Sequence, residues 1–317
     1  MRVIIDTDAG VDDAVGLMLA LGDPAVQLEA ITTVTGNIGV DSVVRNVMTT
    51  LKVMNREDVP VYRGAEHPLI SPWQHETVFV HGNDGLGDWP NRPVSKKNVE
   101  AEHAVMAMIR LVNQYPGEIT LLALGPMTNL ALAIRLDPSF PSKVGRLVWM
   151  GGTNYGMGNT EGMLFSSEFN IHIDPEAAHI VLGAFAESIQ VSWETSTKHS
   201  LSWADFDALA AIKSTPGAQF FQAITAHWRQ ISSTIPQVKG YTMPDPITVA
   251  IALHPELVTH SEHLFVAVEL NGAYTRGATL VDFSGFSGQK PNVHCVLEID
   301  QKAFEGLYRR LLTNGTL

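Results

Sequence analysis

The chain opens with a sharp change from apolar to acidic residues and back again. The apolar run Val3–Ile5 is typical of a strand that is buried in a parallel sheet. Gly10 suits a tight turn, and the apolar segment 15–21 that follows it predicts a helix. The chain therefore begins with a strand, an acidic turn and a helix.

The same alternation of apolar runs and helical spacing continues over the first two thirds of the chain. Further strands are predicted over 28–35, 59–62, 118–124, 146–150 and 188–193, and helices over 41–54, 102–113, 130–136 and 176–182. Irregular stretches separate some of them, over 63–99 and from 151 to 170. This rhythm predicts an α/β fold with an open, mostly parallel central sheet and helices on both faces.

The last third of the chain has a different pattern. Two helices are predicted first, then several strands and a final helix, over 218–232, 246–253, 264–270, 278–283, 292–299 and 301–312. No linker rich in Pro, Gly or Ser and no internal repeat interrupts the sequence. We therefore expect residues 1–317 to form a single domain.

Composition and charge narrow the class of protein. A hydrophobic content of 45% with 17% charged residues is ordinary for a globular protein with a substantial core. The formal net charge of -12 argues against nucleic acid or an anionic membrane as a partner. A small-molecule partner is the expectation that remains.

Cysteine usage and hydropathy bear on the compartment. The single cysteine, Cys295, has no second cysteine in the chain to pair with, which fits a reducing compartment. The first predicted strand begins at residue 3, which leaves no room for a signal peptide. No apolar stretch reaches the roughly 18 residues that a membrane helix needs. We therefore expect a cytoplasmic protein.

Four carboxylates follow the first strand closely, namely Asp6, Asp8, Asp12 and Asp13. Two unit charges about 4 Å apart repel by roughly 4 kcal/mol at an effective dielectric constant of about 20. Such a cluster needs a cation, shared protons or full solvation, and a turn fed by a buried strand is poorly placed for solvation. A hard divalent cation is the favoured interpretation, although Asp12 and Asp13 would also suit the N-terminus of a helix.

Other polar residues also follow apolar runs along the chain. They are Asn37, His81, Asn83, Asp84, Thr128, Asn129, Asn159, Glu168, Asn170, Trp193, Glu194 and Asp245. In an open parallel sheet the carboxyl ends of the strands share one edge, where ligands bind at the switch in strand order. The sequence therefore predicts one acidic, amide-rich pocket without clustered Lys or Arg. Such a pocket disfavours phosphate and favours a neutral polyol such as a sugar, together with calcium.

At this point the sequence resembles a known family. Segment 6–14, DTDAGVDDA, is similar to the N-terminal signature of nucleoside hydrolases of the inosine–uridine-preferring type. Further segments resemble the family in the same order, namely 35–37 (TGN), 81–82 (HG), 125–129 (GPMTN), 150–152 (MGG), 168–170 (EFN), 174–178 (DPEAA) and 245–246 (DP). The resemblance thus covers nearly the whole chain.

The resemblance implies a Rossmann-like nucleoside hydrolase fold and the Ca²⁺-dependent hydrolysis of ribonucleosides to free base and ribose. The carboxylates of Asp8, Asp13 and Asp245 and the backbone carbonyl of Leu124 would bind one Ca²⁺, together with a water and the ribose 2′- and 3′-hydroxyls. Seven or eight oxygen ligands are normal for calcium. A homodimer or homotetramer is also implied.

By the same resemblance, Asp8 would deprotonate the metal-bound water, which then attacks the anomeric carbon through an oxocarbenium-like transition state. The other residues that would contact substrate are Asp12, Asn37, Asn170 and Asp245 at the water and the ribose, and Asn159 and Glu168 at the 5′-hydroxyl. Carboxylate and amide oxygens around the ribose would stabilise its growing positive charge.

Two departures from the family pattern bear on this chemistry. Many members have a His before the last metal-binding Asp, where it helps to protonate the departing base, and this chain has Pro244 there. His81 is one candidate for a replacement acid, stacking of Trp193 on a purine is another route, or the substrate needs little help. The loop between Asn159 and Glu168 is also longer than usual, and the base preference stays open.

Two other functions remain open on the residues alone. A non-catalytic, calcium-dependent protein that binds a nucleoside or sugar would explain Pro244 as a mark of lost chemistry. A phosphatase of the haloacid dehalogenase type also begins with a strand that ends in Asp-x-Asp. Against this last alternative, Gly10 stands where that family has Thr or Val, and no suitable catalytic Lys is evident.

Overall fold

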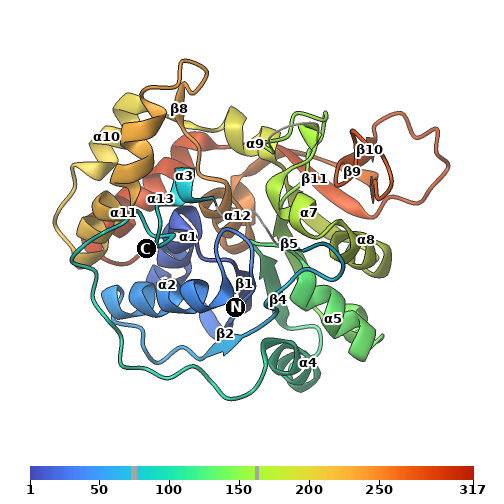
Figure 1. The fold of residues 1–317 in the computed structure, drawn as a ribbon, viewed down its shortest axis with the longest axis horizontal. Helices are drawn as coiled ribbons and strands as arrows, with labels where there is room; N and C mark the ends of the chain where they lie inside the picture. Colours follow the sequence, from blue (N-terminus) through green and yellow to red (C-terminus); the bar gives the residue numbers. More distant parts are fainter. Residues whose placement is uncertain (73–76, 161–163) are drawn as a thin grey trace.

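A computed structural model describes residues 1–72, 77–160 and 164–317, and its centre is one large sheet (Figure 1). The strands of this sheet are β1 Arg2–Thr7, β2 Gln27–Thr33, β3 Val61–Arg63, β4 Ile119–Ala123, β5 Arg146–Met150, β6 Ser188–Val191, β9 Val258–Val268, β10 Thr279–Asp282 and β11 Val293–Ile299. They pair in the order β10-β9-β11-β6-β5-β4-β1-β2-β3. All pairings from β3 to β11 are parallel, and β9 is antiparallel to both of its neighbours.

Helices connect the strands and cover the sheet. They are α1 Val11–Gly22, α2 Val40–Val53, α3 Val78–His81, α4 Ala104–Gln114, α5 Thr128–Leu136, α6 Phe140–Lys143, α7 Phe169–Ile173, α8 Pro175–Ala184, α9 Trp193–Lys198, α10 Trp203–Ala210, α11 Pro216–Ser232, α12 Pro244–Leu253, the 3₁₀ helix Pro255–Leu257 and α13 Gln301–Asn314. A short hairpin pairs β7 Leu201–Ser202 with β8 Gly240–Tyr241.

Both faces of the sheet are buried, as the near-continuous apolar runs predict. Successive residues of a strand point to opposite faces, so Val3 and Ile5 pack into one core cluster while Ile4 packs into the other. The first cluster includes residues of α1, α2, α11, α12 and α13, and the second includes residues of α4, α5 and α8. Figure 1 shows these two sets of helices on different sides of the sheet. The predicted α/β fold is confirmed.

The strand order reverses direction at β1. From β1 the chain moves outward to β2 and β3, and then returns to the other side of β1 with β4, β5 and β6. The register pairs Asp6 with Ala123 and Ala123 with Trp149, so the carboxyl ends of these strands lie along one edge. The gap between β1 and β4 is the point where open α/β sheets bind ligands.

Gly16 allows α1 and α12 to approach closely, although more than 200 residues separate the two helices in the sequence. A Cβ atom on Gly16 would lie 3.2 Å from Val249 Cγ2 and 3.4 Å from the backbone carbonyl carbon of Asp245. The absence of a side chain at this position therefore lets the first turn of α12 approach α1 one turn after the acidic residues. This contact brings Asp245 to the acidic turn.

Several predicted bounds differ from the structure. The strand predicted over 188–193 ends at Val191, because the Ser192 side chain accepts a hydrogen bond from the backbone N–H of Thr195 and begins α9. Helix α10 was not predicted, and its signal is a capping Ser202 three residues before Asp205. Residues 73–76 and 161–163, in the predicted irregular stretches, lie outside the described residues. In the described part of the chain, no helix is long and apolar enough to cross a membrane.

Candidate active site

Asp8 lies directly after β1 at the switch point and is fully buried. Its Oδ2 accepts a hydrogen bond from the backbone N–H of Asn37 at 2.7 Å, whereas its Oδ1 has no partner among the described residues. Two glycines make room for this carboxylate, because a Cβ on Gly36 would lie 2.1 Å from Oδ2 and a Cβ on Gly125 would lie 2.8 Å from Oδ1. Burial, followed by the negative charge of Asp13, raises the pKa of Asp8.

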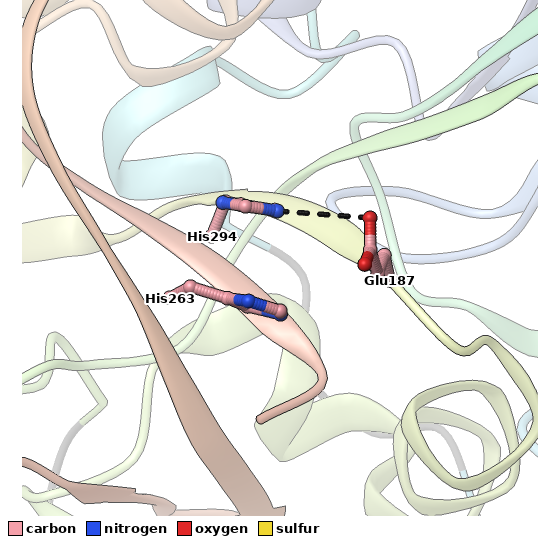
Figure 2. Close-up of side chains that lie close together, drawn as sticks. All are labelled: Glu187, His263 and His294. Atoms are coloured by element: carbon pink, nitrogen blue, oxygen red, sulfur yellow. Dashed lines mark ion pairs between the residues drawn. The ribbon is translucent and has the colours of Figure 1, made fainter. Parts of the chain in front are cut away.

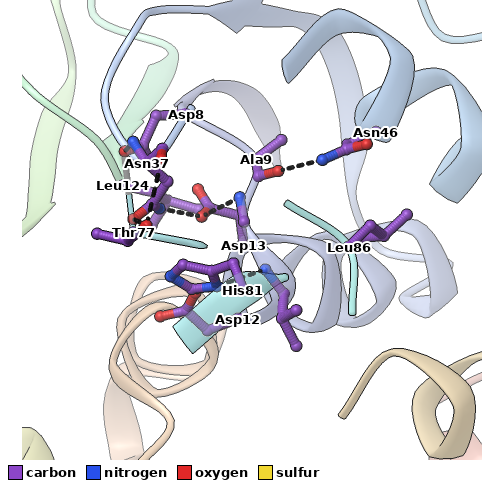
Figure 3. Close-up of polar contacts among 12 residues, drawn as sticks. Asp8, Ala9, Asp12, Asp13, Asn37, Asn46, Thr77, His81, Leu86 and Leu124 are labelled. Atoms are coloured by element: carbon purple, nitrogen blue, oxygen red, sulfur yellow. Dashed lines mark hydrogen bonds and ion pairs between the residues drawn. The ribbon is translucent and has the colours of Figure 1, made fainter. Parts of the chain in front are cut away.

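The turn after Asp8 has an unusual backbone conformation that a buried amide supports (Figure 3). Ala9 has a φ of 24°, in the left-handed region that non-glycine residues rarely adopt. The side-chain amide of Asn46, on α2, donates to the Ala9 carbonyl at 2.9 Å and to the Asp84 carbonyl at 3.1 Å. Asn46 thus holds the acidic turn in place against the loop that follows α3.

Asp13 has both a structural role and a place in the carboxylate cluster. One of its oxygens accepts from the Thr7 hydroxyl, and the other accepts from the backbone N–H of Gly10 at 2.9 Å and from Asn37 Nδ2 at 3.4 Å. The bond to Gly10 caps the first turn of α1. The capping role expected from the sequence is therefore present, and it does not remove Asp13 from the cluster.

Three carboxylates from two helices form a tight group. Oxygens of Asp12, Asp13 and Asp245 all lie within 4.8 Å of one another, and Asp12 Oδ1 is buried without a hydrogen-bond partner among the described residues. Burial is the main cause of the raised pKa of Asp245, and the charges of Asp13, Asp12 and Asp8 add to it. No Lys or Arg of the described chain forms an ion pair with any of these carboxylates. The group therefore requires a cation or shared protons.

The carbonyl of Leu124 faces Asn170 at the end of β4. Asn170 Nδ2 donates to the Leu124 carbonyl oxygen at 2.7 Å and to the Met150 carbonyl oxygen at 3.3 Å. A carbonyl oxygen has two lone pairs, so the bond from Asn170 leaves one of them on Leu124. Asn170 thereby links the ends of two neighbouring strands beside Asp8.

Glu168 and Asn159 organise the backbone on the far side of the switch point. Glu168 is buried and accepts from the backbone N–H groups of Gly152 at 2.9 Å, Asn170 at 2.9 Å and Ile171 at 3.3 Å. Burial raises the pKa of Glu168 to about 7. The exposed Asn159 accepts from the backbone N–H of Phe169 at 2.8 Å. Both side chains thus stabilise the start of α7, where the predicted polar loop ends.

His81, at the end of α3, is buried against the acidic turn. Its Nδ1 accepts a hydrogen bond from the backbone N–H of Val11 at 3.0 Å and lies 3.8 Å from Asp12 Oδ1. Because Nδ1 accepts, the neutral ring carries its proton on Nε2. Burial lowers the pKa of His81 to about 4, which favours this neutral form.

The remaining predicted residues lie at the edges of this region. Trp193 is half-buried at the first position of α9, and its backbone N–H donates to the Gly152 carbonyl at 3.0 Å. Pro244 is the first residue of α12 and is buried next to Asp245. Asn129 has a structural role. Its Nδ2 donates to Asp6 Oδ1 and to the Thr33 carbonyl, and its Oδ1 accepts from the backbone N–H of Ala65.

Sequence reasoning missed three residues that hold this site. Thr7 donates to Asp13, Thr77 donates to Asn37 Oδ1 at 3.0 Å, and Asn46 supports the acidic turn. A signal existed only for Asn46, which stands between the apolar positions Val43 and Val47 on the buried face of α2. A buried amide on such a face needs a polar partner.

An open, mostly parallel sheet with buried carboxylates at its switch point is typical of α/β proteins that bind a small ligand at that edge. Comparison with known protein families then gives the particular family. The model of the inosine-uridine preferring nucleoside hydrolase family matches residues 3–306. The chain therefore belongs to this family, and it is a hydrolase of N-glycosyl compounds that acts on ribonucleosides.

Individual relatives match over almost their full length. The chain is 34% identical to the pyrimidine-specific ribonucleoside hydrolase RihA of Enterobacter sp. (strain 638), covering 100% of this chain and 99% of the relative. It is 35% identical to a probable uridine nucleosidase 2 of Arabidopsis thaliana, covering 95% and 94%. A solved inosine-guanosine nucleoside hydrolase superimposes with a TM-score of 0.89 at 32% identity, covering 98% of both chains.

Proposed function

We propose that the protein is a Ca²⁺-dependent ribonucleoside N-ribohydrolase with its active site at the acidic turn. The observation that carries this proposal is a set of carboxylates, the buried Asp8, Asp13 and Asp245 and the partly exposed Asp12, that has no paired Lys or Arg among the described residues. The family match favours this function over the binding protein and the phosphatase that the sequence alone left open.

The donor atoms suit a hard cation. Asp8, Asp13 and Asp245 would hold Ca²⁺ with the carbonyl of Leu124, and the unpartnered Asp8 Oδ1 supports this assignment. Oxygen donors of this kind are those that calcium prefers. A bound Ca²⁺ would supply a Lewis acid that favours deprotonation of water and holds ribose hydroxyls. The proximity of Asp12 to Asp13 and Asp245 makes Asp12 a further candidate donor.

Asp8 would serve as the general base. One of its oxygens is fixed by the backbone N–H of Asn37, so the orientation of the carboxylate is set. The other oxygen has no hydrogen-bond partner among the described residues, so it can contact both the ion and the water beside it. Asp8 would thus take the proton from the water that attacks the anomeric carbon.

His81 would donate a hydrogen bond toward the departing base. Its Nδ1 is occupied by the backbone N–H of Val11, so the proton resides on Nε2. This arrangement supports His81 as the group that compensates for Pro244, since a positioned donor contributes roughly 10²–10⁴-fold to such a step. The half-buried Trp193 would stack on the base.

The amides and Glu168 would position the ribose. Asn37 and Asn170 each donate to a group at the predicted metal site, namely Asp13 and the Leu124 carbonyl, so both lie where ribose hydroxyls would bind. Glu168 and Asn159 would contact the 5′-hydroxyl from the start of α7. These hydrogen bonds would hold the sugar while the positive charge of the transition state develops.

The decisive experiment is a reducing-sugar assay with inosine, adenosine, guanosine, uridine and cytidine, each with and without a calcium chelator. We expect ribose release that the chelator abolishes and added Ca²⁺ restores. The panel is needed because the relatives differ, one being pyrimidine-specific and another named for inosine and guanosine. Full activity in chelator would contradict the calcium dependence, and nucleoside binding without base release would favour the binding protein.

We also propose that the protein is a homodimer or homotetramer, as the family resemblance implies, and that it is cytoplasmic, as its single cysteine favours. Sedimentation of the purified protein would give the number of chains. A monomer that retains full activity at all concentrations would contradict the proposed assembly.

A further inference from the structure

A second group of metal-binding side chains lies away from the carboxylate cluster. Glu187, His263 and His294 place a carboxylate oxygen and two ring nitrogens within 4.8 Å of one another (Figure 2). Glu187 directly precedes β6, and His294 is the second residue of β11. Because β6 and β11 run parallel to β1, this group lies near the amino ends of the strands, whereas Asp8 lies at a carboxyl end.

The sheet fixes the two histidines beside each other. His263 and His294 are direct partners in the antiparallel pair of β9 and β11, so their side chains stand on the same face. Their rings stack with centroids 4.1 Å apart and planes 9° apart. Two nitrogen ligands are thereby held by a rigid backbone, which reduces the entropy cost of binding an ion.

Glu187 supplies a carboxylate whose ion-pair partner within the described residues is His294 of the same group. Its Oε2 lies 3.8 Å from Nε2 of His294, and within the described ranges it forms no ion pair with Lys or Arg. The carboxylate is therefore available to a cation. A carboxylate with two imidazoles is a ligand set that suits zinc and its neighbours in the first transition row better than calcium.

The group is open to solvent. Val296 lies two residues after His294 on the same face of β11 and is buried in the core, whereas the side chain of His294 keeps 40% of its surface exposed and that of Glu187 keeps 64%. The helices that cover this face thus stop short of His294. An ion can reach the three side chains without any rearrangement of the fold.

We propose that Glu187, His263 and His294 form a binding site for Zn²⁺ or a related late first-row divalent ion. Two ligands at about 2.1 Å from a tetrahedral ion lie about 3.4 Å apart, which is close to the 3.8 Å between His294 and Glu187. The stacked rings lie in nearly parallel planes, so their nitrogens do not point at one common position. To bind the ion, the exposed side chains would turn about their own bonds, without movement of the strands. Three protein ligands leave the fourth position of a tetrahedral ion to water.

Calorimetric titration with Zn²⁺ tests this site, with Ca²⁺ kept in excess to occupy the carboxylate cluster. We expect one equivalent of Zn²⁺ per chain and an affinity that falls at least about tenfold in His294→Ala and in His263→Ala, since even the loss of a residue behind a metal ligand has an effect of this size. His260→Ala is the matched control, because His260 is exposed on the same strand but lies outside the group.

Co²⁺ offers a second readout, since nitrogen ligation changes its visible absorption. We expect this change in the parent protein and in His260→Ala but not in the two variants of the group. Circular dichroism would show whether the variants fold. If His294→Ala does not fold, His294→Gln takes its place, and if His263→Ala does not fold, His263→Gln does. Zn²⁺ binding that is absent in the parent protein, or equally strong in all variants, would overturn the proposal. Nucleoside hydrolysis is expected to be unchanged throughout.

Discussion

At the switch point, the carboxylates differ in how many of their oxygens are held by hydrogen bonds. Asp8 has one oxygen bound by a backbone N–H and the other without a partner among the described residues. Asp13 has both oxygens engaged, by Thr7 and by Gly10 and Asn37. The two carboxylates therefore differ in role although they lie close together in sequence. Asp8 is the one suited to take a proton.

Replacement of Asp8 by Asn tests this role. Asp8→Asn keeps the shape of the side chain and an oxygen for the Asn37 N–H, so the fold is expected to be retained. Turnover is expected to fall by roughly 10²–10⁴-fold or more, because Asn cannot accept the proton. Initial rates of ribose release from the best substrate give the measurement. Asp58→Asn, at an exposed carboxylate paired with Arg56, serves as the control, and an Asp8→Asn variant with the parental rate would disprove the assignment.

The glycine beside Asp8 gives a second prediction. A Cβ at Gly36 would lie 2.1 Å from Asp8 Oδ2 and 2.8 Å from Pro126 Cδ, so Gly36→Ala must displace the carboxylate or the turn. We expect a large loss of activity and a destabilisation of about 1–3 kcal/mol, measured by ribose release and by urea unfolding. Gly183→Ala is the control, since its Cβ position has open space around it in the described structure, apart from its own helix. Equal activity of the two variants would show that this close approach is unimportant.

At the scale of elements, the residues that cap helices explain where the predicted bounds are right and where they are wrong. The capping pattern at Asp174-Pro175 predicts the start of α8, and the structure has the Asp174 side chain accepting from the backbone N–H of Ala177. The predicted end of β6 at residue 193 is wrong, because the Ser192 side chain caps α9 and the strand ends at Val191. Local hydrogen bonds of this kind are readable in a sequence, provided that each one is considered.

Two helical glycines are expected to respond oppositely to the same substitution. Gly306, in α13, has open space around its Cβ position, so Gly306→Ala is expected to stabilise the protein by about 0.5–1 kcal/mol. Gly22, at the end of α1, would place a Cβ 2.3 Å from Cδ1 of the buried Leu311, so Gly22→Ala is expected to destabilise it. Midpoints of urea unfolding measure both effects. Shifts of the same sign would contradict this account.

At the scale of the whole molecule, the two core clusters share one sheet. Cys295 lies on β11 within the second cluster and is fully buried, and Val296 beside it lies in the first. Burial raises the pKa of the Cys295 thiol to about 12, and thiolates rather than thiols react with disulfide reagents. This single thiol therefore reports on opening of the sheet.

Reaction of Cys295 with a disulfide reagent tests whether the chain unfolds as one domain. We expect the native protein to react very slowly at neutral pH. In rising urea, the thiol is expected to become reactive in the same transition that abolishes far-ultraviolet circular dichroism. Rapid labelling before any loss of helix signal would contradict the single domain, since the last third of the chain would then open separately.

Much of this architecture follows from short-range patterns. The strands near 2–7, 119–123 and 146–150 and the helices near 40–53 and 301–314 were predicted within a few residues, because apolar spacing over a few turns specifies them. The acidic turn and the motifs that resemble the family are likewise contiguous in sequence. The sequence by itself therefore determined the order of the main strands and longer helices, the α/β class and the chemical character of the site.

Only the tertiary structure decided which distant residues meet. The contact between α1 and α12 at Gly16 places Asp245 with Asp12 and Asp13, and the register of β9 with β11 pairs His263 with His294. Strand order, register and helix packing depend on side chains that are far apart along the chain. The local spacing of apolar residues does not determine strand order, register or helix packing. The tight carboxylate group and the histidine pair could therefore be identified only from the tertiary structure.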